Sequence, residues 1–293
     1  MTDNQSAVRL VYPQWQGASI VPLVPEIKDP AEASTGYYLG AQLLNFLAPD
    51  NRQKTLTVPV STDTAERKVV DGVFDRDVIV KQNRAALDLL RENDPAKLVV
   101  LGGECAVSVV PFTYLADKYP GDVAMIWIDA HPDITLPGDV YAGFHAMAVT
   151  AIMGKGDPQI IAGLPAKIEA DKILMVGLRN WERDEIRRRQ KEYGIRHLSK
   201  EDLIQNKNAL KDWLNTCGAS KAVVHFDMDV LDPAEIVAAV GTDPDGMKID
   251  EVVALINDVA AEKEIVGLTV AEPMPRTAIR LKNMLARLPL LKK

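Results

Sequence analysis

The sequence has few cysteines and no long apolar runs. Only Cys105 and Cys217 occur among 293 residues, and they form no CxxC pair, which argues against a disulfide framework. No apolar run approaches the roughly 18 residues of a membrane span, and the opening MTDNQSAVRL lacks the pattern of a signal peptide. We therefore predict a cytoplasmic protein with no membrane partner and with reduced thiols, unless a thiol holds a metal.

An excess of positive charge is also missing. The formal net charge is -7 and the sequence pI is about 5.2, so no basic surface is available for DNA or RNA, and we predict no nucleic-acid partner. Apolar residues make up 47% of the chain, which is enough for a buried core. No repeat, low-complexity tract or composition break divides the chain, so we predict a single domain over residues 1–293.

The order of apolar and periodic segments predicts the fold class. Continuous apolar runs, typical of strands covered on both faces, alternate with segments of helical periodicity. This alternation predicts an α/β protein with a mostly parallel sheet between layers of helices. The predicted strands are Leu98–Leu101, Val123–Asp129, Ile173–Val176, Ala222–Asp227 and Ile265–Val270. The predicted helices are Val78–Asn93, Arg183–Tyr193, Asp250–Ala261 and Ala278–Leu288, and the predicted loops are Asn51–Asp75 and Thr135–Gly143.

Acidic residues follow four of the predicted strands at the point where each apolar run stops. Ligands of open parallel sheets bind at the carboxyl ends of the strands, so these residues are candidates for a site. Several carboxylates in one cleft would repel one another, and a bound cation is the natural compensation. The residues expected along this edge, with one histidine and one thiol, are Glu104, Asp129, Asp133, Asp227, Asp229 and Glu272.

Two of these motifs, DAHPD and DMD, have a spacing that favours metal binding. If the strand continues, Asp129, His131 and Asp133 project to one side, and Asp227 with Asp229 repeats the pattern. A DxD motif alone is usually a turn or a helix cap, but two such motifs at the ends of two strands favour a pair of cations. Oxygen-rich ligation with one imidazole suits Mn²⁺ better than a structural zinc site.

The motifs together resemble those of the ureohydrolase family, which comprises arginases, agmatinases and formimidoylglutamases. The resemblance extends from about Lys97 to Pro275, with the motifs in the family's order. It implies a three-layer α/β/α fold, a binuclear manganese centre at the strand ends, and assembly into a homo-oligomer, commonly a trimer or hexamer. The motifs are GGECA from Gly102, DAHPD from Asp129, AGFHAM from Ala142, GLRNWE from Gly177, FDMDVLDP from Phe226, GTDPDGM from Gly241 and GLTVAEPMP from Gly267.

The resemblance also implies a set of metal ligands. One metal would be held by Cys105, Asp129, Asp133 and Asp227, and the other by Asp129, His131, Asp227 and Asp229, with Asp129 and Asp227 bridging. The usual family motif is GGDHS, so Cys105 stands where a ligand histidine is expected. A thiolate binds divalent metals but is softer than imidazole, so zinc or iron can compete with Mn²⁺ there. The alternative is a small buried thiol beside a depleted site.

Roles in catalysis and substrate binding follow from the same resemblance. Asp133 would orient the attacking water and relay its proton, His145 would exchange protons with solvent, and Glu272 would accept hydrogen bonds from a guanidinium group. For substrate binding, Thr135 stands where arginases have an asparagine, Glu182 favours an amino-acid substrate, and Thr242 is expected to line the same pocket. Two further histidines are assigned no role: we predict that His225 is packed in the core and that His197 lies on the surface.

Three functions remain open for the sequence. The first is a binuclear-metal amidinohydrolase that releases urea or hydroxyurea from arginine, hydroxyarginine or a related small molecule. The branch of the family that cleaves hydroxyarginine is similar to this chain in its cysteine and in a PDGM-like loop. The second is a formimidoylglutamase-type hydrolase that releases formamide. The third is a catalytically impaired regulatory or assembly paralogue, for which the altered GGDHS motif is the reason.

Overall fold

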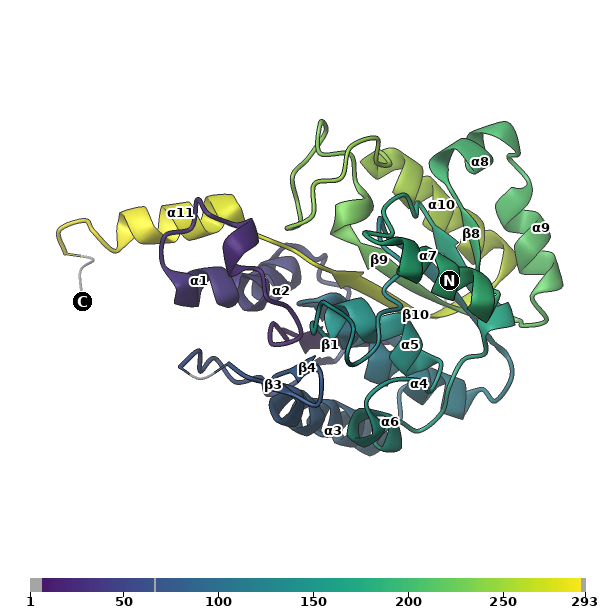
Figure 1. Cartoon of the computed structure of the whole chain (residues 1–293), viewed down its shortest axis with the longest axis horizontal. Helices are drawn as coiled ribbons and strands as arrows, with labels where there is room; N and C mark the ends of the chain where they lie inside the picture. Colours follow the sequence, from purple (N-terminus) through teal and green to yellow (C-terminus); the bar gives the residue numbers. More distant parts are fainter. Residues whose placement is uncertain (1–6, 66, 291–293) are drawn as a thin grey trace.

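The protein is built on a parallel β-sheet. The computed structural model describes residues 7–65 and 67–290, and in these residues eight strands form one sheet in the order β2-β1-β5-β10-β9-β6-β7-β8, with every pair parallel (Figure 1). The strands are β1 Ala7–Tyr12, β2 Thr55–Thr57, β5 Lys97–Gly102, β6 Val123–Ile128, β7 Ile173–Val176, β8 Arg196–Leu198, β9 Lys221–Asp227 and β10 Glu264–Ala271. A separate antiparallel pair is formed by β3 Val69–Val70 and β4 Val73–Phe74.

Helices cover both faces of the sheet. The α-helices are α1 Pro30–Ser34, α2 Gly36–Leu47, α3 Arg76–Asn93, α4 Val109–Lys118, α5 Ala148–Ile152, α6 Pro158–Ala162, α7 Asp184–Tyr193, α8 Lys200–Gln205, α9 Ala209–Thr216, α10 Ile249–Glu262 and α11 Arg276–Leu285. Short 3₁₀ turns are η2 Val21–Leu23, η3 Cys105–Ser108, η4 His145–Met147, η5 Ala170–Lys172 and η6 Met228–Val230.

Alternation along the central strands produces two hydrophobic layers. On one face, Met125 and Trp127 pack with buried residues of α3, α4 and α5. On the other face, Ile126 and Val224 pack with buried residues of α9 and α10, among them Trp213. Each fully buried large apolar side chain contributes roughly 1.5–3 kcal/mol to stability, so both layers are needed to hold the sheet. The expected three-layer α/β/α fold is confirmed.

All of the predicted strands and helices are present, with boundaries that differ by at most three residues. The predicted loop Thr135–Gly143 is confirmed, but the loop predicted over Asn51–Asp75 is wrong in part, because β2, β3 and β4 lie within it. These strands have only two or three residues each, too few to show a period of two. In the part of the chain that the structure describes, no helix has the length and apolar character needed to cross a bilayer.

Helix α11 extends away from the sheet at one end of the molecule (Figure 1). Ile279 is buried against Trp15 and Tyr37 in a small third cluster, which fixes the start of the helix. Farther along, Leu281 is 51% exposed, and Met284 and Leu285 are also exposed. The apolar side of this helix is therefore left open to solvent in a single chain.

Candidate metal centre

Four adjacent strands of the sheet end in the predicted polar residues. In the order β5, β10, β9 and β6, the strands lead into Cys105, Glu272, Asp227 and Asp129. Because the strands are parallel, their carboxyl ends lie at the same edge, as the sequence predicts. All four of these residues are buried, with exposed fractions of 4% or less. The ends of these strands therefore bring three acidic side chains and one thiol together in the protein interior.

The chain after β6 and β9 turns instead of continuing as a strand. Strand β6 stops at Ile128, and Asp129 Oδ1 then accepts a hydrogen bond from the His131 backbone N–H at 2.6 Å. Asp227 Oδ1 likewise accepts one from Asp229 N–H at 2.7 Å, at the start of η6. Our expectation that strand alternation aligns these side chains is wrong. Instead, the hydrogen bonds from backbone N–H groups to the two Asp carboxylates turn the chain and bring the side chains together.

Three groups of potential ligand atoms lie at this edge: one comprises Cys105, His145 and Glu272, and the other two share Asp129. Of the two groups that share Asp129, the first comprises Cys105, Asp129, His225 and Asp227, and the second comprises Asp129, His131 and Asp229. Within each group the ligand atoms all lie within 4.8 Å of one another. Five of the six residues predicted as ligands are thereby brought into two adjoining groups. Asp133 belongs to neither group, and its ligand role stays a prediction.

His225 occupies a place in the first group that the sequence does not assign to it. It is fully buried and its ring stacks on Trp127 with centroids 3.6 Å apart, so the prediction of a packed core histidine is confirmed. Burial lowers the pKa of His225 to about 3, which keeps the imidazole neutral. Cys105 Sγ lies 2.9 Å from Asp227 Oδ2, and burial followed by the nearby acids raises the pKa of the thiol.

The second group is centred on His131. Its Nδ1 lies 3.0 Å from Asp229 Oδ2, and its Nε2 lies 3.3 Å from Asp243 Oδ2. Burial opposes the charged form of His131, but the attraction of Asp229 and Asp129 raises its pKa overall. Burial likewise opposes ionisation of Asp229, yet His131 lowers the pKa of Asp229 to about 2. Sequence reasoning missed Asp243, although it lies in the GTDPDGM motif beside the predicted Thr242.

His145 and Glu272 lie next to each other beside the carboxylates. Glu272 Oε1 accepts a hydrogen bond from Cys105 N–H at 3.1 Å and lies 3.3 Å from His145 Nδ1. The other ring nitrogen of His145 lies 2.7 Å from the hydroxyl of Tyr141. Burial lowers the pKa of His145, but Tyr141 and Glu272 outweigh it and raise the pKa. His145 can therefore carry a proton next to the carboxylate cluster.

A cavity of about 370 Å³ opens onto this site. Its lining includes Cys105, His131, Asp133, Thr135, Tyr141, His145, Glu182, Asp227, Asp229 and Glu272. The hydroxyl proton of Thr135 is already used, because it donates a hydrogen bond to the carbonyl of Ala146 at 2.8 Å. Glu182 is exposed at the rim. Thr242 is exposed and does not line the cavity, whereas its neighbour Gly241 does, so a substrate contact by Thr242 stays a prediction.

Glu104 lies at the same edge but outside both ligand groups. Its carboxylate accepts hydrogen bonds from Gln14 Nε2 and from Ala106 N–H, both at 2.7 Å, and so caps η3. Burial raises the pKa of Glu104 to about 7. His197 is exposed in β8, as predicted for a surface histidine.

The electrostatics of the ligand groups fit divalent cations. Burial, with the added repulsion of neighbouring acids, raises the pKa of Asp133 and Asp227, and it raises the pKa of Asp129 to about 7. Within the described residues, Asp133 Oδ2 and His225 Nε2 are also buried without any hydrogen-bond partner. Positive charge at this place would relieve the repulsion between the acids and supply partners for such atoms.

Asp227 offers a direct test of this repulsion. We expect Asp227→Asn to raise the melting temperature of the metal-free protein at pH 8 by about 2–4 °C, and to remove the stabilisation that Mn²⁺ gives the wild type. An acid whose pKa is raised on folding destabilises the fold as pH rises above its ordinary value of about 4. Asparagine keeps the acceptor for Asp229 N–H and can donate to Cys105 Sγ, but carries no charge.

Thermal unfolding with a chelator and with Mn²⁺, at pH 5 and pH 8, measures both effects. Asp88→Asn, a change on the exposed surface of α3, is the matched control and should behave as the wild type. Equal melting temperatures for the wild type and Asp227→Asn in all four conditions would contradict the account.

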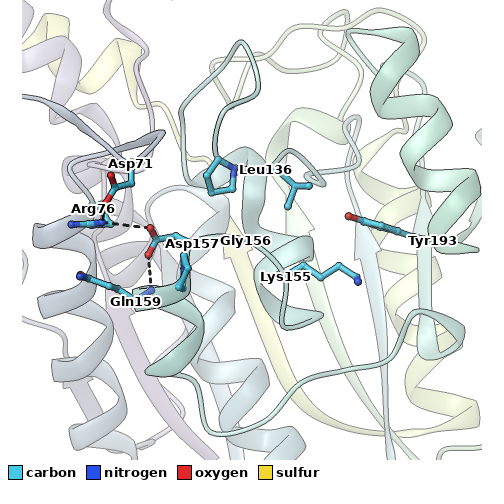
Figure 2. Close-up of a pocket in the computed structure, with 10 residues that line it drawn as sticks. Asp71, Arg76, Leu136, Lys155, Gly156, Asp157, Gln159 and Tyr193 are labelled. Atoms are coloured by element: carbon cyan, nitrogen blue, oxygen red, sulfur yellow. Dashed lines mark hydrogen bonds and ion pairs between the residues drawn. The ribbon is translucent and has the colours of Figure 1, made fainter.

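A wider surface pocket of about 740 Å³ lies elsewhere, and Figure 2 shows its lining. Arg76 there pairs with Asp71 and Asp77, and lies 3.7 Å from Asp157 Oδ2. Lys155 Nζ lies 5.1 Å from the ring centre of Tyr193. Arg76 thus neutralises the acids of this pocket and Lys155 lies against an aromatic ring, and the pocket holds no group of metal-ligand atoms among the residues described. The cavity at the strand ends is the better candidate for chemistry.

Comparisons with known proteins agree with this choice. A family model described as the arginase family matches residues 49–287. An arginase of Eremothecium gossypii is 28% identical over 188 residues, which are 61% of this chain and 47% of that protein. "Arginase 1, mitochondrial" of Arabidopsis thaliana is 25% identical over 216 residues, covering 73% of this chain and 58% of that protein. The chain therefore matches about half the length of these relatives.

Solved structures share the fold. An arginase of Entamoeba histolytica in complex with L-ornithine superposes with a TM-score of 0.72 at 18% identity, covering 93% of this chain and 92% of that one. A formimidoylglutamase of Bacillus subtilis gives a TM-score of 0.66 at 15% identity, covering 94% and 81%. Both kinds of enzyme have this architecture, so the fold alone does not select a substrate.

Proposed function

This chain belongs to the arginase family, and from that premise we propose that it is a metal-dependent hydrolase of a linear carbon–nitrogen bond in a guanidino or amidino compound. The observation that carries the proposal is the pair of ligand groups sharing Asp129 at the base of a cavity walled by His145 and Glu272. An arginase-like reaction, releasing urea or hydroxyurea, uses each of these features.

The residues of the proposed centre divide into two sets. Cys105, Asp129, Asp133 and Asp227 would hold one divalent ion, and Asp129, His131, Asp227 and Asp229 the other, with Mn²⁺ as the expected metal. Divalent ions held there would lower the pKa of a bound water toward about 7 and so supply a nucleophile at neutral pH. Asp243 Oδ2 lies 3.3 Å from His131 Nε2 and would accept its proton, which leaves Nδ1, the nitrogen that lies 3.0 Å from Asp229 Oδ2, to bind the metal.

The remaining residues of the cavity act on the substrate. The carboxylate of Glu272 can accept hydrogen bonds from a guanidinium, a charge-assisted pairing that would hold the substrate carbon above the acids. Asp133 would orient the attacking water and accept its proton. His145 lies beside Glu272 with 21% of its side chain exposed, so it can take a proton from solvent and deliver it to the leaving nitrogen. Thr135, Glu182 and Thr242 are our candidates for contacts to the rest of the substrate.

A substrate panel tests this proposal. Purified full-length protein with Mn²⁺ is expected to release urea from at least one of arginine, hydroxyarginine, agmatine and related guanidino compounds. The same panel with formimidoyl compounds, read by formamide release, separates the second function that the sequence leaves open. Failure to release either product with Mn²⁺, Zn²⁺ or Fe²⁺ would contradict the proposal and favour an impaired paralogue.

We also propose that the protein forms a homo-oligomer in the cytoplasm. The support for assembly is the exposed apolar side of α11, where Leu281 and Met284 are 51% and 49% exposed. Apolar surface of this kind is commonly buried at an interface between subunits. The mitochondrial name of one relative belongs to that protein, and the cytoplasmic location of this chain stays a prediction.

Acidic substitutions on α11 test the assembly. We expect Leu281→Glu with Met284→Glu to convert an oligomer into monomers, because charges at a subunit contact must be stripped of water. Light scattering after size-exclusion chromatography measures the mass. Ile204→Glu is the matched control, since Ile204 is 64% exposed on α8, at the other end of the molecule from α11 (Figure 1). A wild-type monomer, or an unchanged mass for the double variant, would contradict the proposal.

A further inference from the structure

A histidine inside the sheet lies among the ligands of the proposed centre. His225 and Asp227 are two residues apart on β9, so their side chains project to the same face. One ring nitrogen of His225 and the ligand atoms of Cys105, Asp129 and Asp227 all lie within 4.8 Å of one another. This histidine is therefore close enough to share a cation with the three residues.

The two ring nitrogens of His225 are in different situations. Nδ1 lies 2.8 Å from the hydroxyl of Ser108, a fully buried residue of η3. Nε2 is fully buried and has no hydrogen-bond partner in the part of the chain that the structure describes. A buried nitrogen without a hydrogen-bond partner destabilises the fold, so a ligand for Nε2 would remove a penalty that packing alone leaves in place.

The ring is also held rigidly. It stacks on Trp127 with an angle of 8° between the planes, and the Trp127 indole N–H donates to Asp129 Oδ2 at 2.9 Å. Stacking and the Ser108 contact together restrict rotation of the imidazole. Metal-binding histidines typically have this arrangement, in which one nitrogen binds the metal and the other donates to an orienting partner.

We propose that His225 Nε2 is a ligand of the cation that Cys105, Asp129 and Asp227 hold, with Ser108 as its positioning residue. The inference rests on the proposed binuclear centre and deepens it. His225 supplies an imidazole from the sheet side of the site that contains the Cys105 thiol. With Asp133 as the third carboxylate of this ion, the added sulfur and nitrogen ligands suit Zn²⁺ or Co²⁺ better than Mn²⁺.

Cobalt titration of the full-length protein tests the inference without relying on activity. Co²⁺ bound to a thiolate gives a charge-transfer band in the near ultraviolet, so the band reports only the ion in contact with Cys105. We expect the final intensity of this band in the wild type to correspond to one Co²⁺–thiolate bond per chain. The Cys105→Ser variant should show no band. His225→Phe keeps a ring to stack on Trp127 and should weaken Co²⁺ binding at this site at least about 10-fold.

Two further variants test the positioning role of Ser108 and provide a control. Ser108→Ala keeps the imidazole but loosens it, and should weaken the same site about 10-fold or more. His197→Phe changes an exposed histidine and should bind as the wild type. If His225→Phe fails to fold, cobalt-edge X-ray absorption of the wild type replaces it. With both sites filled, it should show an average of one imidazole per ion, whereas one imidazole per two ions would overturn the inference.

The outcomes separate this inference from the proposed function. Equal cobalt affinity and equal band intensity for the wild type and His225→Phe would overturn the role of His225 and leave the binuclear centre intact. A wild type that binds no Co²⁺, Zn²⁺ or Mn²⁺ would overturn both. Weakened binding in His225→Phe with normal binding in His197→Phe supports the assignment.

Discussion

Asp229→Ala is expected to lower metal-dependent kcat/KM by at least about 10³-fold while the fold is retained. A metal ion contributes several kcal/mol of transition-state stabilisation, and about 4 kcal/mol corresponds to this factor. Asp229 Oδ2 lies 3.0 Å from His131 Nδ1, and Asp229 Oδ1 accepts a hydrogen bond from Ala130 N–H at 3.3 Å. Its loss would remove one ligand and also release His131 from its position.

Steady-state assays with the best substrate of the panel measure this effect, and circular dichroism checks the fold. Asp258→Ala, on the exposed side of α10, is the matched control and should keep full activity. A folded Asp229→Ala protein that retains more than about a tenth of the wild-type kcat/KM would show that turnover does not depend on this site. Loss of turnover in the folded variant would instead eliminate the impaired-paralogue reading.

His145→Asn is expected to lower kcat by about 10²- to 10⁴-fold with little change in KM, because a positioned acid or base typically contributes this factor. Asparagine fills a similar volume but cannot carry the proton. His145 Nδ1 lies 3.3 Å from Glu272 Oε1 and Nε2 lies 2.7 Å from the Tyr141 hydroxyl, so the ring is held between the cavity and its wall.

Two measurements distinguish proton transfer from a structural role. Added imidazole should restore part of kcat in His145→Asn, since a free base can enter the vacated space. His197→Asn, at an exposed histidine outside the cavity, is the matched control and should leave kcat unchanged. A kcat for His145→Asn within about 3-fold of the wild type, or a loss that appears in KM alone, would remove His145 from the proton pathway.

Strands β5, β6, β7, β9 and β10 could be predicted from the sequence, whereas the edge strands β2 and β8 and the buried strand β1 were missed. Strands such as Val123–Ile128 are covered on both faces and so appear as continuous apolar runs. The edge strand Thr55–Thr57 is short and mostly exposed, and it joins the sheet through backbone bonds to β1. Backbone pairing leaves no pattern in side-chain chemistry. The sequence therefore predicts a loop for this segment.

Some residues of the site could likewise be predicted from the sequence, and others could not. Residues such as Asp129 and Asp227 end apolar runs, and this abrupt change of polarity marks them in the sequence. His225 lies inside such a run, where a packed histidine is the usual interpretation, and only the fold reveals its distance to Cys105. Asp243 comes from a loop far along the chain, and its contact with His131 depends on how that loop folds back. Long-range contacts of this kind have no local signal.

We expect two divalent ions to bind at the residues around Asp129. Metal content measured by mass spectrometry after equilibrium dialysis against Mn²⁺ or Zn²⁺ tests it most directly. We predict two ions per chain for the wild type and at most one for Asp229→Ala. A wild-type chain that retains no ion at saturating metal, or an Asp229→Ala chain that retains two, would contradict the claim.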